Sequence, residues 1–237
     1  MKILAIDSSS MVATVGIWED DVMVAEYTIN HKKTHSQTLL PMIDEIVKMT
    51  ETDMESVDAI AITGGPGSYT GLRIGSATAK GIGLAINKPI INIPTMDAMA
   101  YNFYSSQYLI CPMMDARRSQ VYTGLYRFDG TKMETMKPQC IMMIQDLVEE
   151  LEQMGLPVMF LGDGVPVNRE FIDQTMKVER HFAPASMNRH RAAAVASLAA
   201  MYYREGKTET AEEHKPDYLR ASQAERELKA KQNNDKV

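Results

Sequence analysis

The feature that most constrains this chain is a glycine-rich loop at residues 63–75, with the sequence TGGPGSYTGLRIG. It connects an apolar segment typical of a strand, residues 57–62, to a segment with the pattern of a helix. Glycine allows positive φ angles and lets another backbone or a phosphate come close, while Pro66 fixes one φ angle. Amide groups at the start of the helix would suit an anion. The loop therefore predicts a tight turn whose backbone amides could face a ligand.

The loop matches none of three well-known functional loops. A Walker phosphate loop has lysine directly after glycine, but Lys80 follows Ala79. A dinucleotide-binding loop needs a third glycine where this chain has Thr70. A nucleophile elbow has glycine two residues before and after its serine, whereas Ser68 has Pro66 and Thr70 at those places. The sequence thus leaves the ligand of the loop open.

Small residues recur every four positions in the helix after the loop, at Gly71, Gly75, Ala79 and Gly83. Positions four apart lie on one face of a helix. Each glycine costs about 1 kcal/mol relative to alanine, so a close contact must compensate for the loss. That contact is either another part of the same domain or a helix of another chain, and the spacing allows both.

Composition and charge exclude several classes of protein. The chain of 237 residues has 25 basic and 31 acidic side chains, so no overall positive field indicates nucleic-acid binding. Its two cysteines, Cys111 and Cys140, lack the spacing of a zinc site and indicate a reducing compartment. The first apolar stretch ends at Asp7, far short of a signal peptide or membrane span. We therefore expect a cytoplasmic protein with no membrane segment.

The pattern of elements predicts an α/β fold with two related half-domains. Residues 2–8, 11–18 and 22–30 have the pattern of strands, a helix follows near residue 36, and residues 57–62 and 90–93 are further strands. The pattern restarts with an apolar strand that ends at Asp115 and an alternating strand over residues 120–128. We expect mixed sheets flanked by helices, with halves at residues 1–105 and 106–220. The charged tail, residues 221–237, is predicted to be flexible.

Two halves that each begin with a strand, an aspartate and a hairpin resemble the superfamily of actin, Hsp70 and sugar kinases. Five motifs make the resemblance more specific, and they extend over nearly the whole chain. They are residues 5–9 (AIDSS), 35–41 (HSQTLLP), 65–75 (GPGSYTGLRIG), 115–122 (DARRSQVY) and 216–220 (PDYLR). With them the chain resembles the TsaB family, also called YeaZ.

That resemblance implies a fold and a function. The TsaB family is similar in fold to its larger paralogue TsaD, which transfers a threonylcarbamoyl group to adenosine 37 of tRNA. TsaB acts as the partner of TsaD, and the ATPase TsaE is a third component. The resemblance implies that this chain binds no cofactor by itself and that ATP and a metal bind in the partner complex. It also implies that the chain contacts tRNA only through that complex. An older label for both paralogues is M22 peptidase.

The metal pair of the catalytic paralogue has no counterpart in this sequence. The resemblance places Thr95 and Met99 where the paralogue has two histidines four residues apart, and neither side chain is of the type that binds a hard or borderline metal. No Ser-His-Asp or Cys-His arrangement is evident either. We therefore expect no catalytic residue and no metal site, which makes the chain a non-catalytic subunit. The alternative from another class is an ATP-dependent phosphotransferase or M22-type peptidase that acts alone.

Two sets of candidate site residues follow from the motifs and the resemblance. The first set could keep a residual nucleotide contact, because aspartate, serine and glycine form the phosphate turns of the superfamily; its members are Asp7, Ser8, Ser9, Gly65, Gly67, Asp115, Gly162 and Gly164. The second set forms a helical surface for the TsaD-like partner, or for a second copy in a homodimer; its members are Leu39, Leu40, Ile43, Ile46, Gly71, Gly75, Ala79 and Gly83.

Overall fold

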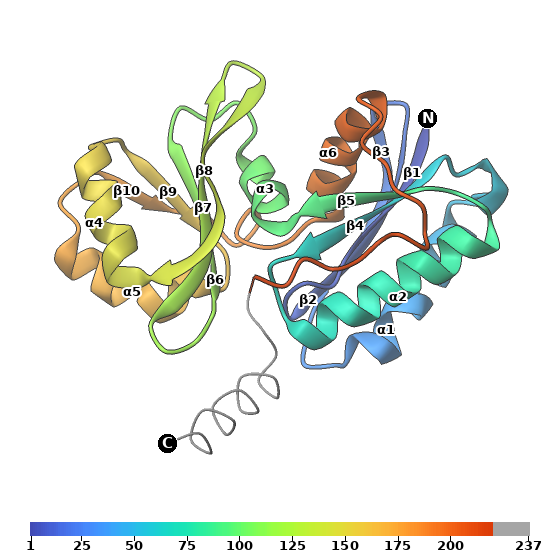
Figure 1. The fold of residues 1–237 in the computed structure, drawn as a ribbon, viewed down its shortest axis with the longest axis horizontal. Coiled ribbons are helices and arrows are strands. Elements are labelled where there is room, and N and C mark those ends of the chain that lie inside the picture. Colours follow the sequence, from blue (N-terminus) through green and yellow to red (C-terminus); the bar gives the residue numbers. More distant parts are fainter. Residues whose placement is uncertain (220–237) are drawn as a thin grey trace, which may run out of the picture.

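The computed structural model describes residues 1–219, which form two five-stranded mixed sheets flanked by helices (Figure 1). The first sheet has the strand order β3-β2-β1-β4-β5. Its strands are β1 (Lys2–Asp7), β2 (Val12–Glu19), β3 (Val22–Asn30), β4 (Ala59–Gly65) and β5 (Ile90–Pro94). Strands β1 to β3 are antiparallel neighbours, while β4 runs parallel to β1 and β5 parallel to β4.

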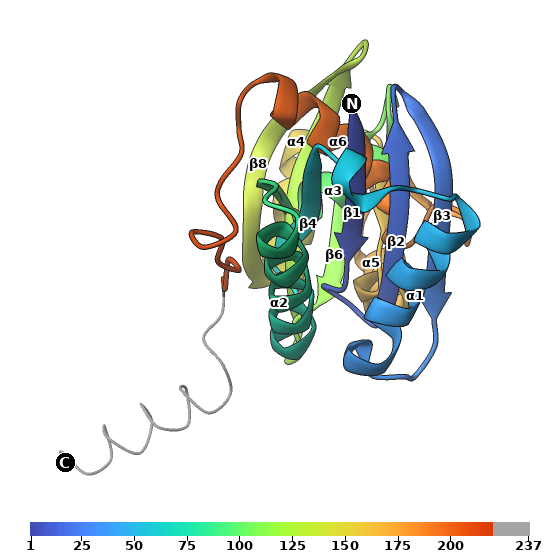
Figure 2. The ribbon, with the colours of Figure 1, turned by 90° about the vertical axis from the view of Figure 1, so that its right-hand side faces the viewer.

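Helices cover both faces of the first sheet (Figure 2). On one face lie α1 (His35–Met49) and α2 (Tyr69–Ala85), and on the other lies α6 (Ala192–Arg204). The spacing of Leu39, Ile43 and Ile46 places all three on the inner side of α1, where each is at most 5% exposed. The alanine-rich sequence of α6 lets that helix lie close to β1 and β2, and its Val195 and Ala199 are fully buried there.

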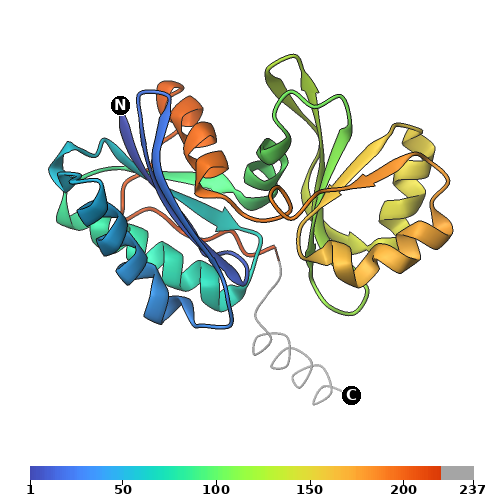
Figure 3. The same ribbon diagram turned by 180° about the vertical axis from the view of Figure 1, so that it is seen from behind.

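The second sheet repeats this topology, in the order β10-β9-β6-β7-β8 (Figure 3). Its strands are β6 (Leu109–Asp115), β7 (Gln120–Asp129), β8 (Lys132–Met143), β9 (Val158–Leu161) and β10 (Arg180–Phe182). Helices α4 (Ile144–Met154) and α5 (Gly164–Thr175) pack together against one face. The other face, toward the first sheet, is covered by α3 (Thr95–Ala100). Two short 3₁₀ turns, η1 (Met54–Ser56) and η2 (Tyr101–Phe103), complete the described elements.

The predicted fold class of two related α/β halves is confirmed. The strands of the first sheet lie before residue 105 and those of the second sheet after it, but α6 of residues 106–220 packs on the first sheet. After β10 the chain returns to the first half, because the small apolar face of α6 packs on the first sheet. No sequence pattern predicted β8, β10, α3 or α5. The predicted flexible tail, residues 221–237, lies outside the described residues.

The segment after α6, residues 205–219, runs along the edge of the first sheet toward the second half. Ile90 and Glu209 exchange two backbone hydrogen bonds, of 2.9 and 3.0 Å, which covers the outer edge of β5. Lys80 on α2 donates to two backbone carbonyls of this segment. The amide of Asp217 then donates to the carbonyl of Gly64 in the glycine-rich loop, at 2.6 Å. Across residues 1–219, no helix combines the length and apolarity that a bilayer crossing requires.

Candidate functional site

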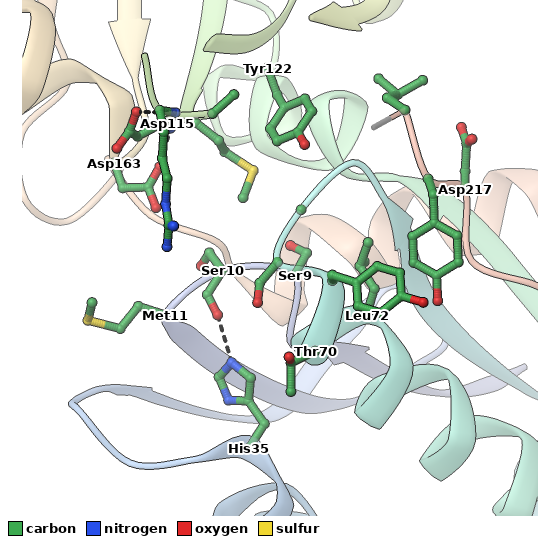
Figure 4. A pocket seen from close by; sticks show the side chains of 18 residues that line it. Ser9, Ser10, Met11, His35, Thr70, Leu72, Asp115, Tyr122, Asp163 and Asp217 are labelled. Atoms are coloured by element: carbon green, nitrogen blue, oxygen red, sulfur yellow. Dashed lines mark hydrogen bonds between the residues drawn. The ribbon is translucent and has the colours of Figure 1, made fainter. Parts of the chain in front are cut away.

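A cleft of about 770 Å³ lies between the two halves, where the turns after β1 and β6 face each other (Figure 4). The first half contributes Ser9, Ser10 and His35, together with the loop before α2. The second half contributes Asp115 at the end of β6, the β6–β7 turn that follows it, and Asp163, two residues after β9. The segment after α6 closes one side of the cleft. There the rings of Tyr69 and Tyr218 lie with their centroids 4.8 Å apart.

Asp7, the last residue of β1, is only 1% exposed and does not line this cleft. One carboxylate oxygen accepts hydrogen bonds from the amide and hydroxyl of Ser9, at 2.8 and 2.7 Å. The other oxygen lies 2.9 Å from Nδ1 of His190, which is 2% exposed. Both oxygens of Asp7 are therefore used inside the protein.

Asp7 and His190 each stabilise the charged form of the other, which sets the direction of both pKa shifts. Burial alone would raise the pKa of Asp7, but the positive charge of His190 and hydrogen bonds from His190 and Ser9 lower the pKa below its usual range. Burial alone would lower the pKa of His190, yet the charge and hydrogen bond of Asp7 raise it above its usual range. Asp7 and His190 thus form a buried ion pair that joins the first turn to the start of α6.

The structure brings together a serine, a histidine and an aspartate that the sequence analysis did not connect. In a hydrolytic triad the aspartate contacts one ring nitrogen of the histidine, and the serine contacts the other. Here Ser9 Oγ and Asp7 both face Nδ1 of His190, at 3.3 and 2.9 Å. The hydroxyl of Ser9 donates its hydrogen bond to the carboxylate of Asp7 and not to the histidine ring. This geometry stabilises the turn and does not activate Ser9 as a nucleophile.

The glycine-rich loop packs against the turn after β1. The amide of Ser68 donates to the carbonyl of Ser9 at 2.6 Å, and the side chain of Ser68 caps α2 by accepting from the amide of Gly71. A Cβ at Gly67 would overlap the carbonyl of Ser9, and a Cβ at Gly71 would overlap that of Ser8. The prediction that these amides face a ligand is therefore wrong for Ser68 and Gly71. The glycines are needed because two backbones meet there.

Only part of the predicted nucleotide set lies at the cleft. Ser9, Gly67 and Asp115 line it, and the other five members do not. The hydroxyl of Ser8 donates to the carbonyl of Gly71, and Gly65 lies against the backbone of Asp217. A side chain at Gly162 or Gly164 would overlap or crowd Met113 on β6. At the three glycines, the space that a side chain would take is filled by the chain itself.

The second half presents its acidic residues more openly. Asp115 is exposed, and one of its carboxylate oxygens accepts a hydrogen bond from the amide of Arg117 at 2.8 Å. The amide of Asp115 donates to the carboxylate of Asp163 at 3.2 Å. After Asp115, residues 117–119 all have positive φ angles between 56° and 64°. The second half thus lines the cleft with Asp115, Arg117 and Asp163, opposite the hydroxyl groups of the first half.

The predicted partner surface needs a correction, because most of its residues are buried within the protein. Ala79 is 0% exposed, and Gly71, Gly75 and Gly83 face the chain's own backbone and side chains. Leu39, Ile43 and Ile46 belong to the core under α1. Of the set only Leu40 is exposed, at 57%. The stripe of small residues therefore serves close packing inside the first half, which was one of the two alternatives.

The positions aligned with the paralogue's metal pair are in the interior. Thr95 and Met99 on α3 are at most 1% exposed, and Met99 packs with Met96 and Met114 between the halves. Within residues 1–219, no three or more histidine, cysteine, aspartate or glutamate side chains form a group that could hold a metal ion. At these two positions the chain has a packed core.

His190, which completes the first turn, was not predicted as a site residue. It lies 183 positions from Asp7, and no local pattern connects the two residues. A weak signal was present, since a single histidine stands among polar residues directly before an alanine-rich helix. Asp217 was noted only as part of a motif. Its backbone binds the glycine-rich loop, and its side chain accepts a hydrogen bond from Gln139 of the second half at 3.4 Å.

Comparison with known proteins identifies relatives over nearly the full chain. The family model of TsaD, described as tRNA N6-adenosine threonylcarbamoyltransferase, matches residues 23–228. The tRNA threonylcarbamoyladenosine biosynthesis protein TsaB of Bacillus subtilis is 32% identical over 95% of this chain and 96% of its own length. The protein of the same name from Escherichia coli is 28% identical, over 98% and 100%. The solved structure of YeaZ from Pseudomonas aeruginosa matches with a TM-score of 0.75 and 24% sequence identity. The match covers 92% of this chain and 99% of the YeaZ chain, so the two share a fold.

Proposed function

Because the chain belongs to the TsaB family of tRNA threonylcarbamoyladenosine biosynthesis proteins, we propose that it acts in this pathway as a non-catalytic subunit. It supports a TsaD-like paralogue that transfers the threonylcarbamoyl group to adenosine 37 of tRNA. A TsaE-like ATPase is the third component. ATP and a metal are bound in the partner complex, tRNA is contacted through that complex, and the assembly works in the cytoplasm.

The state of Asp7 is the observation that carries this proposal. In an enzyme of this fold, an acidic residue at the first turn would have to reach a nucleotide or a reacting group. Here its two oxygens are engaged by Ser9 and His190, at 2.7 to 2.9 Å, and the side chain is 1% exposed. A carboxylate that is buried in this way and lies outside the cleft is not accessible to a substrate. The side chain supports the fold instead of chemistry.

The proposed contact with the paralogue uses the exposed side of α1 and α2, two helices that lie side by side on the first sheet (Figure 1). We define this outer helix face by Leu40, Ala77, Gly81 and Leu84. Leu40 and Leu84 are 57% and 54% exposed, and there is open space above Gly81. Small and apolar residues on adjacent helices suit the close approach of helices from a partner of the same fold.

The test is reconstitution with purified TsaD-like and TsaE-like proteins, tRNA, ATP and threonylcarbamoyl donor. Modified tRNA is expected only when this chain is added, and the chain alone with the same substrates is expected to show no turnover. Ala77→Arg should weaken binding of the paralogue at least ~10-fold, because it places a charge on the outer helix face. Val167→Arg on α5, also at an exposed site, is the matched control. Robust ATP hydrolysis or peptide cleavage by the isolated chain would contradict the proposal.

A further inference from the structure

Three buried polar atoms near the junction of the two halves have no hydrogen-bonding partner among residues 1–219. They are the hydroxyl oxygens of Thr63 and Thr95 and the Nε2 nitrogen of His190. The three residues are at most 2% exposed, so bulk solvent does not reach these atoms. A buried polar group without a partner destabilises a fold, so three such groups in one region call for an explanation.

The strand register places two of these groups side by side on one face of the first sheet. Ile6 pairs with Ile62 in the parallel ladder of β1 and β4, so Asp7 and Thr63 are the next neighbours, with Cα atoms about 4.8 Å apart. The odd-numbered residues before them in both strands pack under α6, and side chains two positions apart share a face. Asp7 and Thr63 therefore also face α6, and His190 contacts Asp7 there at 2.9 Å.

Thr95 reaches the same region from the next strand. Thr63 pairs with Ile93 of β5, and Thr95 follows two positions later as the first residue of α3. Ile93 belongs to the cluster under α6, and α3 contacts both β4 and α6. Figure 1 shows α3 between the two sheets. The three groups thus lie where the adjacent parallel strands β1, β4 and β5 end, between the first sheet and the helices α3 and α6.

The donors and acceptors of the three groups define what could bind them. Nδ1 of His190 faces Asp7 in the ion pair, so the charged ring has its second proton on Nε2 and can only donate there. Each threonine hydroxyl can both donate and accept. A molecule that accepts from the ring and hydrogen-bonds to two hydroxyls therefore satisfies all three groups. Because the region is closed to solvent, that molecule is about the size of one water.

The local charge favours a neutral molecule over an ion. The positive charge of His190 is balanced by Asp7. A cation would be repelled by the ring, and an anion would bring a buried charge without a partner of its own. Asp163 and Arg189 also act on the ring, with charges of opposite sign, so they do not shift this balance to either side.

We propose that one internal water molecule binds at this junction, accepting a hydrogen bond from Nε2–H of His190 and hydrogen-bonding to the hydroxyls of Thr63 and Thr95. Internal waters typically make about three hydrogen bonds to groups that the protein leaves unpaired. This water connects β4, α3 and the segment before α6, and α3 also packs on the second sheet. It therefore helps to hold the two halves together. The proposal does not rest on the proposed function.

The first experiment is a crystal structure of the full chain grown with bromide as the halide. A density peak is expected about 2.7 to 3.2 Å from each of the three atoms, without the anomalous signal of bromide. Thr95→Ser keeps the hydroxyl and should retain the peak, whereas the double variant Thr63→Val, Thr95→Val should lose it. A bromide signal at this position, no peak, or a direct hydrogen bond between the two threonine hydroxyls would overturn the proposal.

Urea denaturation tests the same water in solution through the direction of an effect. If water binds the hydroxyls, Thr63→Val and Thr95→Val each remove a hydrogen bond and should lower the urea midpoint by about 0.3 M or more. If a hydroxyl has no partner, its removal should raise the midpoint instead. The matched control is Thr123→Val, because the buried hydroxyl of Thr123 donates to the carbonyl of Pro112 at 2.8 Å. The control should also lower the midpoint.

A double-mutant cycle tests whether the two threonines share one ligand. The double variant Thr63→Val, Thr95→Val should lower the midpoint by less than the sum of the two single shifts, because either change already disturbs the shared water. Thr63→Val combined with Thr123→Val on the second sheet should be additive. Circular dichroism should show a native fold in every variant, since valine has nearly the shape of threonine. Additive shifts for the first pair, or a higher midpoint in either single variant, would contradict a shared water.

Discussion

The turns that follow β1 and β6 occupy equivalent places in the repeated fold, yet their aspartates have opposite surroundings. Asp7 is 1% exposed, and its carboxylate is enclosed by Ser9 and His190. Asp115 is exposed at the cleft and accepts a hydrogen bond from the amide of Arg117. The same residue type at the same position of a repeat can therefore stabilise the fold in one half and face a cleft in the other.

The return of the chain to the first half explains the difference. His190 precedes α6, and α6 packs on the first sheet, so the histidine reaches the end of β1. After β6, the β6–β7 turn instead contacts Asp163, which belongs to its own half. Closure of the first turn is thus a consequence of the C-terminal crossover.

The largest effect should come from breaking the enclosed pair. Asp7→Ala leaves His190 buried without its partner and removes the carboxylate oxygen that accepts from both the amide and the hydroxyl of Ser9. We expect a loss of about 3 to 5 kcal/mol in the free energy of unfolding, the range for removing one member of a buried pair. Urea denaturation followed by circular dichroism measures it. A loss below about 1 kcal/mol would show that the pair does not hold the turn.

The contact between the loop and the first turn predicts the next largest effect. Gly71→Ala places a methyl group against the carbonyl of Ser8, whereas Gly81 on the same helix has open space. We expect Gly71→Ala to cost about 2 kcal/mol and Gly81→Ala to stabilise by up to about 1 kcal/mol. Thermal unfolding of the two variants gives the comparison directly. Equal effects at both positions would mean that the loop can move away from the turn.

The ion pair also predicts a dependence of stability on pH. The pKa of His190 is raised above its ordinary value of 6.5, so the stabilisation is complete below pH 6.5 and is lost as pH rises through the folded pKa. The pKa of Asp7 is lowered, so its contribution is present above its ordinary value of 3.8 and is lost as pH falls through the lower folded pKa.

We therefore expect the unfolding free energy to fall as pH rises above 6.5 and through the raised pKa of His190, by at most about 1.4 kcal/mol per pH unit for one proton. The variant His190→Gln should lack this slope. Urea denaturation at several pH values measures it. If the unfolding free energy of the wild type had the same pH dependence as that of the variant, the ion pair would not be its cause.

The smallest effect is expected in the second turn. Asp115→Ala removes the acceptor for the amide of Arg117 at an exposed site, and we expect a cost of about 1 kcal/mol or less. The same denaturation experiment provides the value. If Asp115→Ala lowered the free energy of unfolding as much as Asp7→Ala, the two aspartates would not differ in their contribution to stability.

Much of the fold could be predicted because strands and helices leave local patterns. Alternating side chains identified β2 and β7, and three-and-four spacing identified α1. Strand β8 was missed because Lys137 and Pro138 interrupt its apolar pattern, and α3 is only six residues long. The position of α6 could not be predicted, since its alanines would suit either sheet and tertiary packing decides between them.

The candidate site was only half predictable for a related reason. The turn chemistry of Asp7 and Ser9 is local, and the sequence pattern predicted it. The enclosure of that turn depends on His190 and on the glycine contacts of α2, which are long-range. Spacing alone could not decide whether the stripe from Gly71 to Gly83 faced its own sheet or a partner. Burial decided in favour of the sheet.

The most direct test of the structural role of the first turn uses the reconstituted transfer reaction with the double variant Asp7→Asn, His190→Gln. This change replaces the ion pair by neutral groups of similar shape that can still form hydrogen bonds. At saturating concentrations the rate of threonylcarbamoyl transfer to tRNA is expected to stay within about twofold of wild type. A loss of about 100-fold, with the fold and the assembly intact by circular dichroism and sedimentation, would contradict a non-catalytic first turn.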